Sequence, residues 1–255
     1  MKHYIKKAIL IFNKNITAKI SNKYKLNHKD KGVINFIDIG SVGGLPEPWQ
    51  SNAFRVKYLL NFEPNETIKE GLNFMTYNTA IWRKEEERPF YIYKGLKGTG
   101  SSLLEQNYEY VQENFDSLKN KGPKRLAITW FERSKLVKTL NLKCKSLDAI
   151  LNEKFPSKDF HFIKIDAQGA ELNILKGAET ALKKCVGLHL ELFSIPLYKN
   201  MALLPEVEEY LSQHDFKLVK KFPPHGTFNS QNDCLFLKKK EDDTFATLIR
   251  QFYNI

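Results

Sequence analysis

From Val33 onward, apolar runs of strand length alternate with segments whose apolar positions recur every three or four residues. The runs indicate buried strands, and the longer spacing indicates amphipathic helices. The expected strands cover 33–39, 58–62, 74–77, 160–165, 186–192, 216–219 and 234–237, with 90–93 as one arm of a hairpin. The expected helices cover 103–119, 147–154, 169–184 and 203–214. Ser146 is expected to cap the second helix, the third strand should run on towards Trp82, and 122–144 favours neither type.

This alternation predicts an α/β fold in which a mostly parallel sheet is covered on both faces. The connection 220–233 between the last two strands is rich in Pro, Gly and Asn and has no helical pattern, which favours an antiparallel final strand. We therefore expect a three-layer sandwich around a seven-stranded sheet. Ligands of such sheets bind at the carboxyl ends of the strands.

The N-terminal segment 1–31 carries most of the positive charge. Its nine lysines and single acid, Asp30, account for +8 of the total net charge of +11. Its apolar residues recur at helical spacing, at Ile5, Ile9, Phe12, Ile16 and Ile20. The apolar run 8–12 is too short for a secretory signal, and no window reaches the length of a membrane span. We expect a basic amphipathic helix that packs on the main domain, and the alternatives are contact with a membrane surface, an anionic partner or a second copy in a homodimer.

Composition limits the class and the compartment. With 42% hydrophobic and 27% charged residues, the chain is typical of globular proteins rather than of disordered ones. Cys144, Cys185 and Cys234 lie far apart, which excludes a disulfide framework and a thiolate zinc site and favours a reducing compartment. We expect a cytoplasmic protein, with a peripheral place at the inner membrane face as the alternative. The expected parts are 1–31, a main domain over 32–240 and a helical tail over 241–255.

A glycine turn follows the first strand, in Asp38-Ile39-Gly40-Ser41-Val42-Gly43-Gly44. It lacks the middle glycine on which a pyrophosphate rests in dinucleotide-binding turns. An acid two positions before the first glycine suits a cationic ligand, and S-adenosylmethionine carries ammonium and sulfonium charges. A strand–loop turn that simply needs glycine is the alternative.

A second acid ends the second strand. Glu63, followed by Pro64, lies 23 residues after Gly40, one βα unit later. A carboxylate there can accept both ribose hydroxyls of an adenosine, and the same arrangement would serve NAD. At the end of the third strand, Asn78 and Thr79 are expected near the adenine edge, with a purely structural role as the alternative, and Ala80 is a further candidate for cofactor binding.

The densest motif covers residues 163–172. Strand alternation turns Lys164 and Asp166 to one face, and Asp166 should stand at the carboxyl end of its strand. Glu171 falls in the first turn of the next helix, where the helix dipole favours a carboxylate.

The next strand contributes His189 and Glu191, which alternate with leucines. Polar side chains in a central strand are costly unless they are paired or functional. Both residues are therefore candidates for a general base, and a hydrogen-bonded core pair is the alternative.

At these residues the chain resembles the FkbM-type S-adenosylmethionine-dependent methyltransferases. The resemblance rests on motifs in the family's order between about residues 33 and 237: Asp38-Ile39-Gly40, Phe62-Glu63-Pro64, Ser101-Ser102-Leu103-Leu104, Ser146-Leu147-Asp148, Ile163-Lys164-Ile165-Asp166 with Gly169-Ala170-Glu171, Leu175-Lys176-Gly177-Ala178, and Glu191 with Pro196-Leu197-Tyr198. Two departures stand out. Gln168 replaces the family's usual glutamate, and residues 43–49 replace the usual segment after the glycine turn.

The resemblance implies a class I, Rossmann-like methyltransferase fold, S-adenosylmethionine as cofactor, S-adenosylhomocysteine as product, and transfer to an oxygen, often a hydroxyl of a sugar or glycoside. Candidate cofactor-binding residues are Asp38, Gly40, Ser41, Gly43, Glu63, Pro64, Asn78, Ala80, Asp166 and Gln168. Candidate catalytic residues are Asp166, His189 and Glu191. Candidate substrate residues are Trp49, Ser101, Ser102, Lys164 and Tyr198. A divalent cation held by Asp166 and Glu191 is the alternative means of lowering the hydroxyl pKa, but the sequence offers no complete ligand set.

Two other functions are weighed. Nucleic-acid methylation or binding draws on the basic segment, but the strand ending at Asp166 lacks the Asn/Asp-Pro-Pro-aromatic motif of amino-group methylases, and nucleic acid is not the expected partner. A nicotinamide-dependent oxidoreductase is disfavoured by the missing phosphate-binding glycine.

Overall fold

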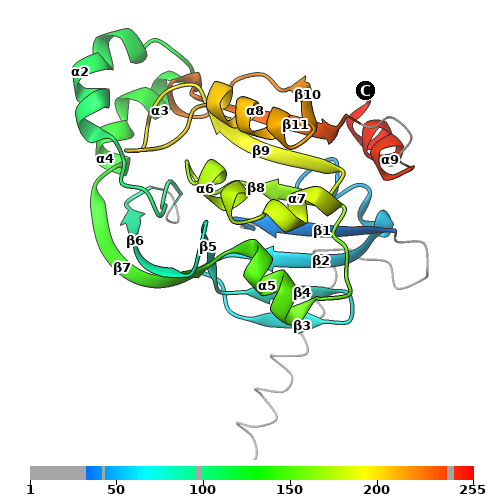
Figure 1. Cartoon of the computed structure of the whole chain (residues 1–255). Helices are drawn as coiled ribbons and strands as arrows, with labels where there is room; N and C mark the ends of the chain where they lie inside the picture. Colours follow the sequence, from blue (N-terminus) through cyan, green and yellow to red (C-terminus); the bar gives the residue numbers. More distant parts are fainter. Residues whose placement is uncertain (1–32, 42–43, 96–98, 240–243) are drawn as a thin grey trace, which may run out of the picture.

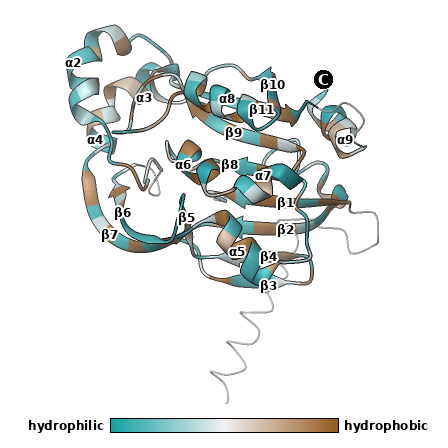
Figure 2. Ribbon diagram, viewed as in Figure 1, coloured by the Kyte–Doolittle hydropathy of each residue, from teal (hydrophilic) through white to brown (hydrophobic). Residues whose placement is uncertain are grey.

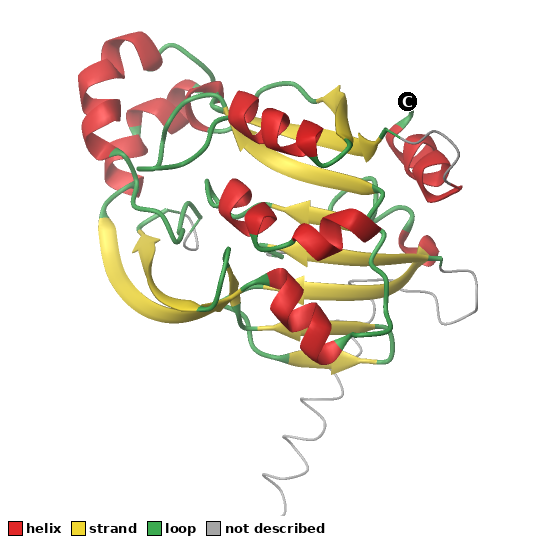
Figure 3. Cartoon of the chain, viewed as in Figure 1, coloured by secondary structure: helices red, strands yellow, loops and turns green. Residues whose placement is uncertain are grey.

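The computed structural model describes residues 33–41, 44–95, 99–239 and 244–255 (Figure 1). The helix expected over 1–31 and the candidate Gly43 lie outside the described residues. The expected α/β fold is present, with a large mixed sheet at the centre and helices lying across it (Figure 3). None of the described helices combines the length and the apolar character needed to cross a membrane.

The large sheet has eight strands in the order β10-β11-β9-β8-β1-β2-β4-β3. They are β1 (Ile34–Ile39), β2 (Val56–Phe62), β3 (Lys69–Gly71), β4 (Phe74–Tyr77), β8 (Phe162–Ile165), β9 (Gly187–Phe193), β10 (Phe216–Lys221) and β11 (Gln231–Lys238). The strands β4, β2, β1, β8 and β9 pair in parallel. The last strand, β11, is antiparallel to both β9 and β10, as expected.

The expected count of seven strands is wrong, because β3 adds an eighth strand at the edge. β3 consists of Lys69, Glu70 and Gly71 and pairs antiparallel with β4 across a short turn. It contains no apolar residue, so the hydrophobic pattern carries no signal for it. A short edge strand of this kind also resists pairing with another chain.

A second sheet holds β5 (Ala80–Ile81), β6 (Glu86–Tyr93) and β7 (Leu136–Lys145), in the order β5-β7-β6. The third predicted strand therefore does not run on to Trp82, since the chain leaves the large sheet after Tyr77 and enters this one. Residues between β6 and β7 form α2 (Tyr108–Leu118), α3 (Lys124–Ile128) and α4 (Trp130–Arg133). The second sheet and these helices lie beyond the carboxyl ends of the strands, at the left of Figure 1.

Helices α5 (Leu147–Lys154), α6 (Glu171–Lys176), α7 (Glu179–Lys184) and α8 (Leu204–Gln213) cover one face of the large sheet. The Ser146 hydroxyl accepts the Ala149 N–H at 3.2 Å, which confirms the predicted cap. The single helix expected over 169–184 is two helices. Asp148 explains the break, because its carboxylate accepts the N–H groups of Thr180 (2.7 Å) and Ala181 (2.9 Å) and thereby caps α7 from a neighbouring helix.

The other face is covered by a segment that includes the short 3-10 helix η1 (Ala53–Arg55) and by α9 (Thr244–Tyr253). The side chains packed there are Ile34, Phe36, Trp49, Phe162, Leu235, Leu237, Ile249 and Tyr253. Figure 2 shows β9 largely hydrophobic and α2 largely hydrophilic. The sheet is thus covered on both faces, and the buried acids Asp38, Glu63 and Glu191 lie at or near the carboxyl ends of β1, β2 and β9.

Candidate active site

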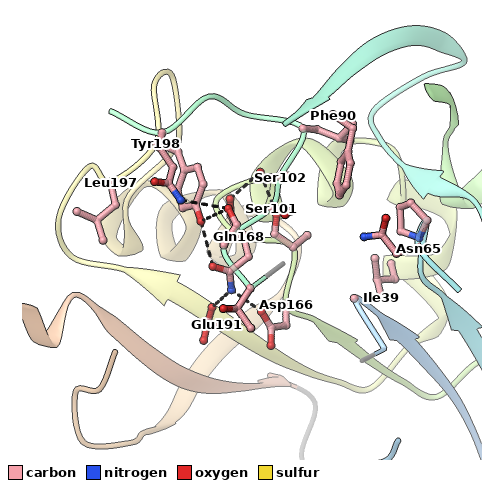
Figure 4. Close-up of a pocket in the computed structure, with 18 of the residues that line it drawn as sticks. Ile39, Asn65, Phe90, Ser101, Ser102, Asp166, Gln168, Glu191, Leu197 and Tyr198 are labelled. Atoms are coloured by element: carbon pink, nitrogen blue, oxygen red, sulfur yellow. Dashed lines mark hydrogen bonds between the residues drawn. The ribbon is translucent and has the colours of Figure 1, made fainter. Parts of the chain in front are cut away.

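A cavity of about 570 Å³ lies at the carboxyl ends of β1, β2, β8 and β9 (Figure 4). This volume is typical of sites for small organic ligands. The large sheet supplies one wall, with Gly40, Glu63, Asp166 and Glu191. The other walls come from β6, the segment 99–106, helices α3 and α4, and the residues around the 3-10 helix η3 (Thr227–Asn229).

Gly40 allows the ends of three strands to meet at the cavity. Its N–H donates to Phe62 O at 2.9 Å, and the Asp166 N–H donates to Ile39 O at 3.0 Å. Gly40 has φ +81°, and a Cβ added to it would lie 1.9 Å from Asp166 O. A residue with a side chain would therefore push β1 away from β8.

Glu63 stands at the end of β2, buried in the cavity wall. Its Oε1 accepts the Asn65 N–H at 3.0 Å. Burial raises the pKa of Glu63 above its ordinary value, and the Asn65 hydrogen bond partly opposes that effect. The predicted cofactor residues Gly40, Glu63, Pro64, Ala80, Asp166 and Gln168 all line the cavity, whereas Asp38, Ser41 and Asn78 do not.

Gln168 joins the two carboxylates of the site (Figure 4). Its Nε2 donates to Asp166 Oδ1 at 3.0 Å and to Glu191 Oε2 at 2.7 Å. The Tyr198 hydroxyl reaches Gln168 Oε1 at 3.1 Å, and Gln231 Nε2 donates to Glu191 Oε2 at 2.8 Å. An amide can serve here where a third carboxylate would repel the other two.

Glu191 has a pKa well above the ordinary value of a glutamate, because it is buried and because Asp166 and Glu171 place negative charge beside it. A carboxylate with a raised pKa is a stronger proton acceptor than an exposed one. Glu191 is therefore the side chain in this cavity that is best suited to take a proton from a ligand.

The Glu171 side chain holds the backbone on both sides of Gln168 in place. Its Oε1 accepts the N–H groups of Ala167 (2.9 Å) and Gly169 (3.2 Å), and burial raises its pKa to about 7. The native state thus keeps this proton up to about pH 7, whereas the unfolded chain releases it near 4.5. Because the native state binds more protons in that window, its free energy of unfolding falls as pH rises from 4.5 to about 7.

Replacing Glu171 with Gln should remove the contribution of this residue to the fall in the free energy of unfolding between pH 4.5 and about 7. That contribution amounts to at most about 3 kcal/mol. The amide still accepts the two backbone N–H groups but does not titrate. Urea unfolding at about pH 5 and about pH 8 measures the change. Glu179→Gln, in the exposed first turn of α7, is the matched control. A wild-type pH dependence in Glu171→Gln would contradict the expectation.

Three further predicted site residues, Trp49, His189 and Lys164, also lie outside the lining of the cavity. Trp49 is fully buried between Phe36 and Phe162 and donates its indole N–H to the Tyr253 hydroxyl at 2.9 Å, so it is a core residue and does not face a substrate. The local sequence around Trp49 does not distinguish the two roles, because α9, which buries this ring, lies about 200 residues later in the chain.

His189 is not among the lining residues of the cavity. Its Nδ1 lies 2.8 Å from the Tyr253 hydroxyl and its Nε2 lies 3.1 Å from Asp233 Oδ1. It shares a strand face with Glu191 but is two residues nearer the start of β9, under α9. The structure therefore places it in a buried polar network, which was the alternative to a catalytic role.

Lys164 is also absent from the cavity lining, and its side chain contacts two carboxylates. Its Nζ lies 3.4 Å from Asp38 Oδ1 and 3.7 Å from Asp166 Oδ2. Burial works against its charge, but the two carboxylates raise its pKa above the ordinary value. Lys164 thus keeps Asp38 and Asp166 partly neutralised. The other substrate candidates, Ser101, Ser102 and Tyr198, do line the cavity.

Several lining residues had no signal in the sequence. Arg133, Thr227 and Gln231 come from stretches without a helical or strand pattern, and tertiary packing alone brings them to the cavity. Within the part of the chain that the structure describes, no group of three or more His, Cys, Asp or Glu side chains is arranged to hold a metal ion.

Comparison with known proteins identifies the protein family of this chain. A family model described as the methyltransferase FkbM domain matches residues 26–218. Among solved structures, the chain is similar to methyltransferase FkbM from Methylobacillus flagellatus KT, with 14% identity and a TM-score of 0.45 over 84% of this chain and 47% of that one. It is also similar to Sp1610 of Streptococcus pneumoniae, a candidate tRNA methyltransferase, with 10% identity and a TM-score of 0.36 over 91% and 77% of the two chains.

The chain spans about half the length of the first of these structures. The comparison with curated proteins finds no match. The family model, in contrast, covers more than half of the chain. The matched region runs from before β1 to within β10 and includes the Gly40 turn and the carboxylates Glu63, Asp166 and Glu191. By this match, the chain belongs to the family of FkbM-type methyltransferases.

Proposed function

We propose that this chain is an S-adenosylmethionine-dependent O-methyltransferase that acts on a hydroxyl group of a sugar, glycan or glycoside. The observation that carries the proposal is the convergence of Glu63, Asp166 and Glu191 on one cavity beside the Gly40 turn. Several carboxylates around one cavity favour a ligand with positive charge. Family membership supports methyl transfer, and the raised pKa of Glu191 supports a hydroxyl acceptor, which must lose a proton.

The residues of the cavity fit this cofactor. The Asn65 N–H occupies one of the roughly four lone-pair positions of the Glu63 carboxylate, which leaves capacity for both ribose hydroxyls. Gly40, Pro64 and Ala80 line the cavity with Glu63 and offer little steric obstruction to a nucleoside. Asp166 supplies negative charge for the cationic part. When bound, S-adenosylmethionine supplies a methyl group that its sulfonium has already activated.

The protein itself has to position the acceptor, exclude water and remove one proton. With S-adenosylmethionine bound, the acceptor oxygen would bond to the methyl carbon as the carbon–sulfur bond breaks, and S-adenosylhomocysteine would leave with the electron pair of that bond. The carboxylate of Glu191 would take the hydroxyl proton. Gln168 and Gln231 both donate to Oε2 of that carboxylate, which leaves Oε1 for the hydroxyl proton. Gln168 also donates to Asp166, which lines the same cavity.

Binding of S-adenosylhomocysteine tests the cofactor part of the proposal. Isothermal titration calorimetry on the full chain should show binding of S-adenosylhomocysteine and none of NAD. Glu63→Gln should weaken that binding about 10- to 100-fold, the usual cost of losing a charged hydrogen-bond acceptor. Glu70→Gln, on the exposed edge strand β3, is the control and should keep wild-type affinity. Unchanged affinity in Glu63→Gln would place the ribose contact elsewhere.

A further inference from the structure

One lining residue has a charge opposite to that of its neighbours. Arg133, the last residue of α4, is half-buried in the cavity wall. The other charged side chains among the described lining residues are Glu63, Glu66, Asp166 and Glu191. Arg133 is thus the one basic side chain among the described residues that line the cavity.

The surrounding structure holds Arg133 in place through neutral groups. Its Nη2 donates to Leu126 O at 2.8 Å and to Thr227 Oγ1 at 2.9 Å, and its Nε donates to Thr129 Oγ1 at 3.2 Å. These bonds tie α3, α4 and η3 together and fix the plane of the guanidinium. They use Nε and Nη2 only, and no described residue forms a hydrogen bond with Nη1.

No carboxylate in the described part of the chain forms an ion pair with Arg133. Burial lowers its pKa, and the group that opposes this effect is the Tyr198 phenol rather than a carboxylate. A partly buried charge without a counter-ion costs stability, so a structure normally pairs it. A guanidinium that is rigidly held, faces a cavity and lacks a counter-ion is suited to bind an oxyanion from outside the chain.

We propose that the acceptor substrate carries an anionic group, a phosphate or a carboxylate, and that Arg133 binds it. This inference rests on the methyl transfer proposed above. The walls near Arg133 fit such a substrate: Trp130 offers an aromatic surface, and Thr227 and Gln231 offer polar groups. Glu63 and Asp166 remain for the cationic cofactor, whereas Glu191 serves the acceptor hydroxyl and Arg133 its anionic group. The acceptor is then a phosphorylated sugar, a nucleotide-linked sugar or a sugar acid rather than a neutral glycoside.

The test uses the full chain saturated with S-adenosylhomocysteine. Calorimetry compares glucose 1-phosphate, glucuronate and glucose, which distinguish a phosphate, a carboxylate and no charge, and inorganic phosphate probes the anion alone. Wild type should bind at least one anionic sugar about 10- to 100-fold more tightly than glucose. Raising the salt concentration should reduce this preference. The variant Arg133→Gln should lose the preference for the anionic sugar. Arg125→Gln should keep this preference, because Arg125 is exposed on the neighbouring helix α3.

Arg133→Lys separates recognition from folding. It keeps the charge but loses the fork of donors, so it should bind the anion with intermediate affinity. Binding of S-adenosylhomocysteine by Arg133→Gln shows that the cavity is intact. The inference is overturned if wild type binds S-adenosylhomocysteine but does not prefer an anion, or if Arg133→Gln and wild type show the same preference. Failure of wild type to bind S-adenosylhomocysteine overturns the proposed function instead, and the inorganic phosphate titration still reports on Arg133.

Discussion

Glu191→Gln is expected to lower kcat by about 10²- to 10⁴-fold, the usual contribution of a positioned base. The amide has the shape of the carboxylate but cannot take the hydroxyl proton. Binding of S-adenosylhomocysteine should change little, because Asp166, Gly40 and Glu63 remain in place. Single-turnover transfer of a labelled methyl group measures the loss, and calorimetry on the same protein measures cofactor binding.

The pH profile identifies the base. Because burial and neighbouring charge raise the pKa of Glu191, wild-type kcat/KM should fall as pH is lowered through a value above 4.5. Glu191→Gln should lack this acid limb, whereas His189→Gln should retain it, since His189 contacts Tyr253 and Asp233 outside the cavity. An acid limb that survives in Glu191→Gln and disappears in His189→Gln would reverse the assignment.

Gly40→Ala is expected to destabilise the protein by about 2–4 kcal/mol and to abolish measurable cofactor binding. Two costs add. The backbone has φ +81°, which disfavours any side chain, and the new methyl group would meet the backbone oxygen of Asp166 at 1.9 Å. A backbone atom in a sheet cannot move away as a flexible side chain can, so β1 and β8 would have to separate at the cavity.

Gly100→Ala is the matched control for this variant. Gly100 also has a positive φ, +87°, but the nearest atom to an added Cβ is the side-chain nitrogen of Gln106 at 3.1 Å. It should therefore show the conformational cost without the backbone clash, and be destabilised less than Gly40→Ala in urea unfolding. Equal losses in the two variants would mean that the contact with Asp166 is unimportant.

The parts of the fold that the sequence predicts well are those in which burial dictates residue type. Strands β1, β8 and β9 are almost wholly buried, so their apolar runs are long and unambiguous. β3 and β7 are largely exposed or polar, and their pairing depends on neighbours that lie far away in the chain. The division of 169–184 into two helices depends on Asp148, which belongs to another helix.

The candidate site follows the same distinction. Gly40, Glu63, Asp166 and Glu191 stand at or near the carboxyl ends of predictable strands, and because these strands are parallel, their ends meet at one edge of the sheet beside the cavity. For His189, alternation indicates the correct face, but the covering helix α9 decides that it is a buried partner of Tyr253. For Arg133, no local pattern exists, because its position depends on how α4 packs against η3.

The second sheet and helices α2–α4 form one continuous insertion between β4 and α5 of the main fold. It begins and ends at adjacent positions, since Ala80 pairs with Cys144 and Ile81 with Lys145. It supplies Phe90, Trp130 and Arg133, while the large sheet supplies Gly40 and Glu63. A block whose two ends meet at one point can be exchanged between related chains without altering the strand order of the large sheet, beside which the candidate cofactor residues Gly40, Glu63 and Asp166 lie. Under the proposed function, replacing this one continuous stretch is expected to change which acceptor the chain binds, because the stretch carries Trp130 and Arg133.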